Sequence, residues 1–217
     1  MKSFFARYQQ DLCEQVWEEL YTLGPTVRNA DVYADAEAVA TETMRRVRYN
    51  IEAIIPRLEE LGYQFGYEWT WGSPMTSSFW VERQPARTTS PAPDIAAQIE
   101  RFEAQVGLLP LSLKAFYREV GGVNFVGSHP AWERLLDPQN TLGMEAAAKL
   151  DPLFVWNFTE DSVEDWSSSP KEVSYHAILA PDRYFKYDIS GSGPYWMEVP
   201  NAAADGMLHD ETCYNLS

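Results

Sequence analysis

The sequence predicts an α+β fold, in which a twisted, mainly antiparallel sheet carries helices packed on one side and follows an N-terminal helical extension. Three observations lead to this prediction. Apolar residues recur every three or four positions in the first 60 residues, as on helical faces. A helical hairpin is expected near the middle of the chain. Short apolar segments separated by turn residues follow it, and these are typical of strands.

Two helical patterns open the chain. The first covers residues 4–23 and ends at Gly24-Pro25. The second covers residues 33–61, with Gly62 as the glycine that ends it. Pro56 lies inside the second pattern and predicts a kink or a break in the preceding turn, because proline removes a helical hydrogen bond.

The chain changes character after this second pattern. Residues 63–67 alternate like a short strand, and residues 83–93 (RQPARTTSPAP) have the composition of a linker or surface loop. We therefore divide the chain into two parts. Residues 1–93 form a helical extension with an aromatic segment and a linker, and residues 94–217 form the α+β module.

Residues 94–122 predict a helical hairpin. Asp94 suits the N-cap of its first helix, and Gly107 suits its end. Pro110 suits the first position of the second helix, and Gly121-Gly122 end that helix. Each helix has one apolar face, so the pair is expected to cover a sheet.

Four segments after the hairpin predict strands. They are residues 124–126, 153–158, 175–179 and 195–199.

The net charge of −15, from 17 basic and 32 acidic side chains, bears on the class of partner that the protein can bind. Nucleic-acid affinity depends on Lys and Arg that neutralise phosphates, so direct nucleic-acid binding is disfavoured. Residues 94–217 carry 8 basic and 19 acidic side chains. A basic partner would be steered toward this half of the chain.

We expect a cytoplasmic protein that does not contact membranes. No segment approaches the roughly 18 apolar residues of a membrane helix, and the N-terminus lacks the apolar region of a leader peptide. Cys13 and Cys213 lie far apart in the sequence and form no metal or redox motif, which favours a reduced, cytosolic chain.

Histidines and cysteines, which are common catalytic residues and metal ligands, are few in this sequence. The three histidines, His129, His176 and His209, belong to no triad or metal-ligand pattern. Residues 209–213 (HDETC) offer mixed donors, but contiguous side chains point in different directions, so a solvated acidic terminus is favoured over a metal site. We therefore expect no catalytic residue, no cofactor and no metal, and predict that the protein is not an enzyme. A hydrolase that uses scattered carboxylates is the weaker alternative.

Several spaced motifs resemble the SUKH superfamily, which includes the fungal cell-wall-synthesis regulator and many bacterial immunity proteins. The motifs are LPLSLKAFYREVGGVNFVGSHPAW at 109–132, DPLFVW at 151–156 and LAPDRYFKYDISGSGPYWMEVPNAAAD at 179–205, and together they resemble the bacterial branch. Residues 44–65 are similar to the helix that precedes the module in such proteins. Relatives usually continue past the position of Ser217 into another aromatic-rich helix.

The resemblance implies a non-catalytic protein-binding module, and specifically an immunity protein that neutralises a cognate toxin by occluding its active site. The acidic charge agrees with a basic toxin domain as partner, because toxins that act on nucleic acid are expected to be basic. The fungal relatives imply an alternative, an intracellular scaffold or regulatory protein without a toxin partner.

Eight acidic or aromatic residues are candidates for the partner-binding surface. They are Asp161, Glu164, Asp165, Asp188, Asp205, Trp132, Trp156 and Tyr195. Exposed acidic side chains would act mainly on the association rate with a basic partner. The acidic run at 161–165 can also be interpreted as a solvated loop. Trp132 and Trp156 can also be interpreted as core residues beside turns.

Overall fold

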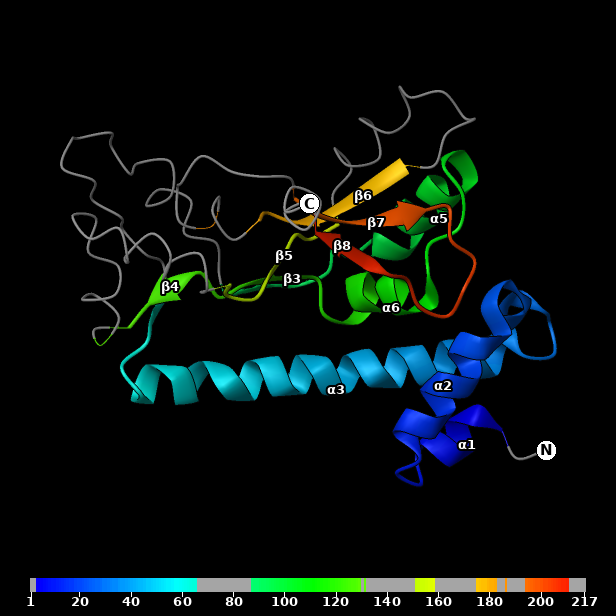
Figure 1. The fold of residues 1–217 in the computed structure, drawn as a ribbon, viewed down its shortest axis with the longest axis horizontal. Helices are drawn as coiled ribbons and strands as arrows, with labels where there is room; N and C mark the ends of the chain where they lie inside the picture. Colours follow the sequence, from blue (N-terminus) through cyan, green and yellow to red (C-terminus); the bar gives the residue numbers. More distant parts are fainter. Residues whose placement is uncertain are drawn as a thin grey trace, which may run out of the picture.

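The computed structural model describes residues 3–65, 87–129, 131, 151–158, 175–182, 186 and 194–210. The fold is α+β, as predicted (Figure 1). A long helix runs along one side of the molecule, with two short helices at one of its ends. A helical pair and the strands lie together on the other side of the long helix.

The N-terminal part consists of helices. They are α1 (Phe4–Tyr8), α2 (Cys13–Leu23), the 3-10 helix η1 (Gly24–Arg28) and α3 (Tyr33–Glu60). The prediction of one continuous helix over residues 4–23 is wrong. The chain breaks at Asp11, whose φ of 62° is left-handed, a conformation that aspartate tolerates better than most residues. The break lets Tyr8 and Val16 enter one buried cluster, while Leu12 between them is 42% exposed.

Of the kink or break predicted before Pro56, the break is wrong. α3 continues through Pro56, which lies in its last turns. The helix ends as predicted at Gly62, which has a φ of 88°. The Gly62 N–H donates to the Glu59 carbonyl and the Tyr63 N–H to the Leu58 carbonyl, both at 2.9 Å, which satisfies the last free carbonyls of the helix.

The helical hairpin is confirmed. Its helices are α5 (Ile95–Gln105) and α6 (Leu111–Glu119). Gly107 and Gly121 follow them with φ values of 119° and 85°. Asp94 is at the N-cap as predicted, but its carboxylate accepts a hydrogen bond from the Gln98 side chain at 2.9 Å instead of from a backbone N–H. Pro110 is the N-cap of α6, one position before the predicted one.

Within the described residues, all strand pairs are antiparallel. The strands are β1 (Gln64–Phe65), β2 (Thr88–Thr89), β3 (Gly122–Asn124), β4 (Gly127–Ser128), β5 (Phe154–Val155), β6 (Tyr175–Ala180), β7 (Tyr195–Val199) and β8 (Leu208–Asp210). β1 pairs with β4, and two three-stranded sheets have the orders β2-β3-β5 and β6-β7-β8. The Trp156 N–H donates to the Leu179 carbonyl at 2.8 Å, which joins the β5 end to β6 and connects these two sheets.

The longer predicted strands agree best with the structure. β6 and β7 match the predicted segments 175–179 and 195–199. β5 is shorter than predicted, and β3 begins two residues earlier than predicted. β2 lies within the expected linker and pairs with β3, and β8 is not among the predicted strands. The division of the chain after residue 93 stays a prediction.

Helices α5 and α6 pack against one side of the β6-β7 pair. On β6, Ala177 and Leu179 are buried, whereas Ile178 between them is 50% exposed. On β7, Met197 and Val199 are buried and belong to the same cluster as the apolar side chains of α5 and α6. The alternation shows which side of these strands faces the core.

α6 also contacts the N-terminal helices. Leu111 and Ala115 of α6 share a buried cluster with Val16, Leu20 and Val39. α6 therefore lies between the N-terminal helices and the strands, and its position depends on both.

The burial of the Tyr63 hydroxyl leads to a prediction of how the stability of the fold depends on pH. This hydroxyl donates to the Phe125 carbonyl at 2.5 Å, and burial raises the pKa of Tyr63 to about 12. The folded pKa lies above the unfolded value of about 10, so this stabilisation is complete below pH 10 and is lost as the pH rises toward 12. We expect the free energy of unfolding in urea to fall above about pH 10. The fall should be smaller in Tyr63→Phe, and identical pH profiles for the two proteins would contradict the prediction.

Candidate functional site: an apolar groove beside strand β8

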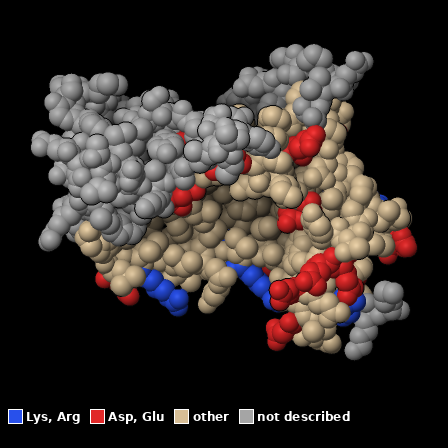
Figure 2. Space-filling view, in the orientation of Figure 1, with Lys and Arg blue, Asp and Glu red and all other residues tan. Residues whose placement is uncertain are grey.

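A groove with a volume of about 480 Å³ opens between the N-terminal helices and the strands (Figure 2). Figure 2 shows it as a hollow near the centre of this face, with acidic side chains beside it on the strand side. Three parts of the chain supply most of its apolar lining. They are α2 and α3 with Trp17 and Met44, α6 with Leu113 and Phe116, and the strands with Val155, Leu179, Met197 and Leu208, together with Leu153 just before β5.

Hydrogen bonds fix the helical wall of the groove. The Trp17 indole N–H donates to the Thr43 hydroxyl at 3.1 Å, which joins α2 to α3. The Thr43 hydroxyl also lies 2.9 Å from the Tyr8 hydroxyl and 2.9 Å from the Val39 carbonyl. These hydrogen bonds hold Trp17 of α2 against α3, which also carries Met44.

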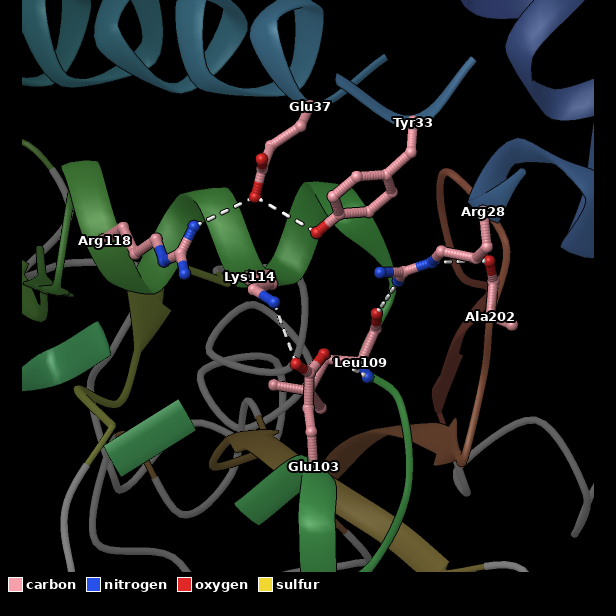
Figure 3. Close-up of polar contacts among 8 residues, drawn as sticks. All are labelled: Arg28, Tyr33, Glu37, Glu103, Leu109, Lys114, Arg118 and Ala202. Atoms are coloured by element: carbon pink, nitrogen blue, oxygen red, sulfur yellow. Dashed lines mark hydrogen bonds and ion pairs between the residues drawn. The ribbon is translucent and has the colours of Figure 1, made fainter. Parts of the chain in front are cut away.

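Arg28 ties this wall to the module (Figure 3). Its Nε donates to the Ala202 carbonyl at 3.0 Å, and its Nη2 donates to the Leu109 carbonyl. Ala202 precedes β8 and Leu109 precedes α6, so one guanidinium holds two loops of the module beside the N-terminal helices. A planar guanidinium suits two such acceptors because its donors form a fixed fork.

A second contact in Figure 3 joins α3 to α6. Glu37 of α3 accepts a hydrogen bond from the Arg118 guanidinium of α6 at 3.0 Å and one from the Tyr33 hydroxyl at 3.2 Å. Both charged side chains are about one third exposed, so we assign this pair an orienting role and little stabilisation.

The loop before β8 caps the N-terminus of α6 with backbone carbonyls. Pro110 has no side-chain acceptor, so the first N–H groups of α6 need acceptors elsewhere. The Leu111 N–H donates to the Ala203 carbonyl at 3.2 Å, and the Ser112 N–H donates to the Ala204 carbonyl at 2.9 Å. This capping holds the loop against α6 and leads the chain into β8 along the groove.

Asp205 in the same loop lies at the groove and accepts a hydrogen bond from the Ser112 hydroxyl. Its carboxylate is thus next to the N-terminus of α6, where the helix dipole favours a negative charge.

A charged cluster lies at the groove. The Lys186 side chain is 3% exposed, and its ammonium lies 2.5 Å from one Asp151 oxygen. The Tyr195 hydroxyl donates to the other Asp151 oxygen at 2.6 Å. A buried ammonium needs such a partner, because its desolvation is otherwise very costly. The cluster therefore fixes the position of Tyr195 at the groove.

Apolar side chains at the groove remain in contact with water. Leu153 is 46% exposed and Leu208 is 55% exposed, and Met207 beside Leu208 is 65% exposed. Apolar side chains gathered on a concave surface mark a contact site more often than scattered ones do.

The structure brings two of the eight predicted partner-binding residues to this groove, Tyr195 and Asp205. Trp156 is 39% exposed and packs edge-to-face on Phe154, which lines the groove, with ring centroids 5.4 Å apart. The other five predicted residues lie outside the described residues. They are Trp132, Asp161, Glu164, Asp165 and Asp188.

His209, the histidine of the HDETC segment, takes part in an aromatic stack. His209 of β8 and His176 of β6 stack on Trp196 of β7, with ring centroids 4.2 and 3.5 Å from the indole. Among the residues that the structure describes, no group of three or more potential metal ligands comes together. Residues 211–213 lie outside that set.

Within the described ranges, no helix is both long enough and apolar enough to cross a membrane.

Comparisons with known proteins find no match for this chain, neither among protein-family models, nor among curated proteins, nor among solved structures. Its function has to be inferred from the groove and the charge around it.

Proposed function

We propose that this protein is a non-catalytic protein-binding module, and that its groove takes an apolar, positively charged segment of a partner protein. The exposed apolar side chains at the groove carry this proposal. Leu153 and Leu208 leave about half of their surface in water, and a partner that covered them would gain hydrophobic free energy.

The charge of the chain favours a basic partner. Residues 187–217 contain five acidic residues and no Lys or Arg. They include β7, the loop with Asp205 and β8, and Asp205 lines the groove. Charges placed around an apolar site act mainly by steering the partner and by rejecting partners of like charge.

We further propose that the partner is a basic toxin domain and that this protein is an immunity protein, which neutralises the toxin by occluding its active site. Two observations support this step, the resemblance of the motifs to the SUKH superfamily and the net charge of −15. A partner with no toxic activity would favour the alternative, an intracellular scaffold or regulator.

The proposal is tested by affinity capture from the native cells, with the unmodified protein and two variants. Leu208→Asp places a charge at the groove, and Leu61→Asp makes the same change at the C-terminal end of α3, where Leu61 is 71% exposed. We expect a basic protein whose affinity falls about tenfold or more with Leu208→Asp and stays unchanged with Leu61→Asp, since burying a charge opposite apolar surface is costly. Equal binding by both variants would exclude the groove as the contact surface.

A second measurement addresses the toxin. The captured partner, produced alone in a host cell, should stop growth, and co-production of this protein should restore it. The Leu208→Asp variant should fail to restore growth, whereas Leu61→Asp should succeed. Normal growth with the partner alone would contradict the immunity function and leave the binding function intact.

A further inference from the structure

We propose that the partner segment carries an arginine that pairs with Asp205, while apolar side chains next to that arginine enter the groove. This inference rests on the proposed function, because it names the group of the groove that anchors the partner. The contact would fix one cationic side chain of the partner beside one carboxylate of this chain.

The charges at the groove leave one carboxylate without a cation. Among the described residues that line the groove, the charged ones are Asp151, Lys186 and Asp205. The Lys186 ammonium lies 2.5 Å from Asp151, so these two charges balance each other. Within the described part of the chain, Asp205 forms no ion pair, and its side chain is bonded to the Ser112 hydroxyl and the Gly206 N–H. Asp205 is therefore the charge that a cation from a partner would neutralise.

One oxygen of the Asp205 carboxylate is already used and the other is not. Both hydrogen bonds reach the same oxygen, Oδ1, with the Gly206 nitrogen 2.9 Å away. Oδ2 accepts no hydrogen bond from the described residues, and Asp205 is exposed. The dipole of α6 amounts to only about half a charge at the helix N-terminus, so it does not replace a counterion. A cation can therefore pair with Oδ2 without displacing an existing contact.

The loop that carries Asp205 is held in place on both sides. Gly206 lies so close to Met197 of β7 that a Cβ at this position would overlap the Met197 side chain. The carbonyls of the two residues before Asp205 accept hydrogen bonds from the N-terminus of α6. A carboxylate on such a constrained loop loses little conformational freedom when it binds, which favours one specific contact.

The aromatic lining of the groove favours arginine over lysine. Trp17 and Phe116 line the groove, and Trp17 packs against the buried cluster that contains Ala204, the residue before Asp205. A guanidinium can stack on an aromatic ring while its in-plane N–H groups donate to a carboxylate, whereas an ammonium is a compact and strongly hydrated charge. An arginine can thus pair with Asp205 and lie against the Trp17 ring.

Apolar side chains of the partner would lie close to this arginine. Leu208 follows Asp205 by three residues, so their Cα atoms are at most about 11 Å apart. Leu208 also lines the groove and is 55% exposed. One short segment of the partner can therefore cover Leu208 and reach Asp205, and covering the ion pair would exclude the water that weakens it.

The test measures the binding of two short peptides to the full-length protein by isothermal titration calorimetry. Each peptide has leucines on both sides of a central residue, which is arginine in the first peptide and citrulline in the second. Citrulline has nearly the same shape as arginine but no charge. We expect the arginine peptide to bind about tenfold more tightly, as is typical of a hydrogen bond between charged groups.

Two matched variants show whether Asp205 makes the contact. Asp205→Asn keeps an oxygen for the Ser112 hydroxyl and the Gly206 N–H but removes the charge. Glu198→Gln removes the same charge from an exposed position of β7 that is not part of the groove lining. We expect the preference for arginine over citrulline to disappear with Asp205→Asn and to persist with Glu198→Gln. Its loss in both variants would show that only the net charge matters and would overturn the contact.

Three other outcomes would overturn the arginine contact. Equal binding of both peptides, weakened by Leu208→Asp, would leave the groove as the contact surface but without an arginine anchor. Absence of any peptide binding would overturn the contact too, while the capture of the native partner would still decide the proposed function. Self-association of the unmodified protein that Asp205→Asn abolishes would assign Asp205 to a contact with a second copy of this chain.

Discussion

Replacing Phe102 with alanine is expected to lower the free energy of unfolding by about 3–5 kcal/mol, the range for emptying a buried aromatic site. Phe102 of α5 is 0% exposed and lies at the centre of the cluster that joins α5 and α6 to β6 and β7. Its ring is edge-to-face with that of Phe158, with centroids 5.7 Å apart. The substitution would remove this contact and leave a cavity that rigid strands and helices cannot close.

Urea denaturation measures this effect, with Tyr49→Ala as the control. Tyr49 lies on α3 and is 71% exposed, so the control also removes an aromatic ring but empties no buried site. We expect the control to change stability by no more than about 0.5 kcal/mol. Similar losses in the two variants would show that Phe102 is not a core residue.

The elements that the sequence predicts best are those whose pattern lies within one continuous stretch of the chain. The apolar faces of α5 and α6 are confirmed, and so are the glycines that end them, Gly107 and Gly121, because a left-handed φ next to a helix end favours glycine. β6 and β7 are confirmed because each is five or six residues long and alternates between buried and exposed positions.

Other elements depend on contacts that are distant in the sequence. β2 and β8 have two and three residues, too few to show a period of two, and each exists because it pairs with another strand. Residues 4–23 have an unbroken apolar period in the sequence, yet the chain turns at Asp11, and α1 and α2 both contact the same buried cluster.

The groove could not be predicted for the same reason. Its apolar side chains come from α2, α3, α6 and the four strands β5 to β8, and each of them has an ordinary core interpretation in the sequence. Tyr195 and Asp205 were selected for their aromatic or acidic character, and the fold brings them to the groove. Leu208 was not selected, because a single leucine in an acidic segment gives no signal before β8 is paired with β7.

Replacing Lys114 with methionine is expected to lower the free energy of unfolding by about 3–5 kcal/mol, the range for removing one partner of a buried ion pair. The Lys114 and Glu103 side chains are 9% and 11% exposed, and the ammonium lies 2.8 Å from the Glu103 carboxylate (Figure 3). The other carboxylate oxygen accepts the Leu109 N–H at 3.1 Å. Methionine fills a similar volume, so the loss would come from the unpaired charge of Glu103 and not from a cavity.

The double variant Lys114→Met/Glu103→Gln separates these causes. Glutamine keeps an oxygen for the Leu109 N–H but carries no charge, so the double variant should be more stable than Lys114→Met by about 1–3 kcal/mol. Urea denaturation of the unmodified protein, the two single variants and the double variant gives the coupling energy between the side chains. A double variant no more stable than Lys114→Met would mean that the unpaired charge of Glu103 is not the cause of the loss. The loop that joins α5 to α6, which also accepts the Arg28 hydrogen bond at Leu109, would then not depend on the buried pair.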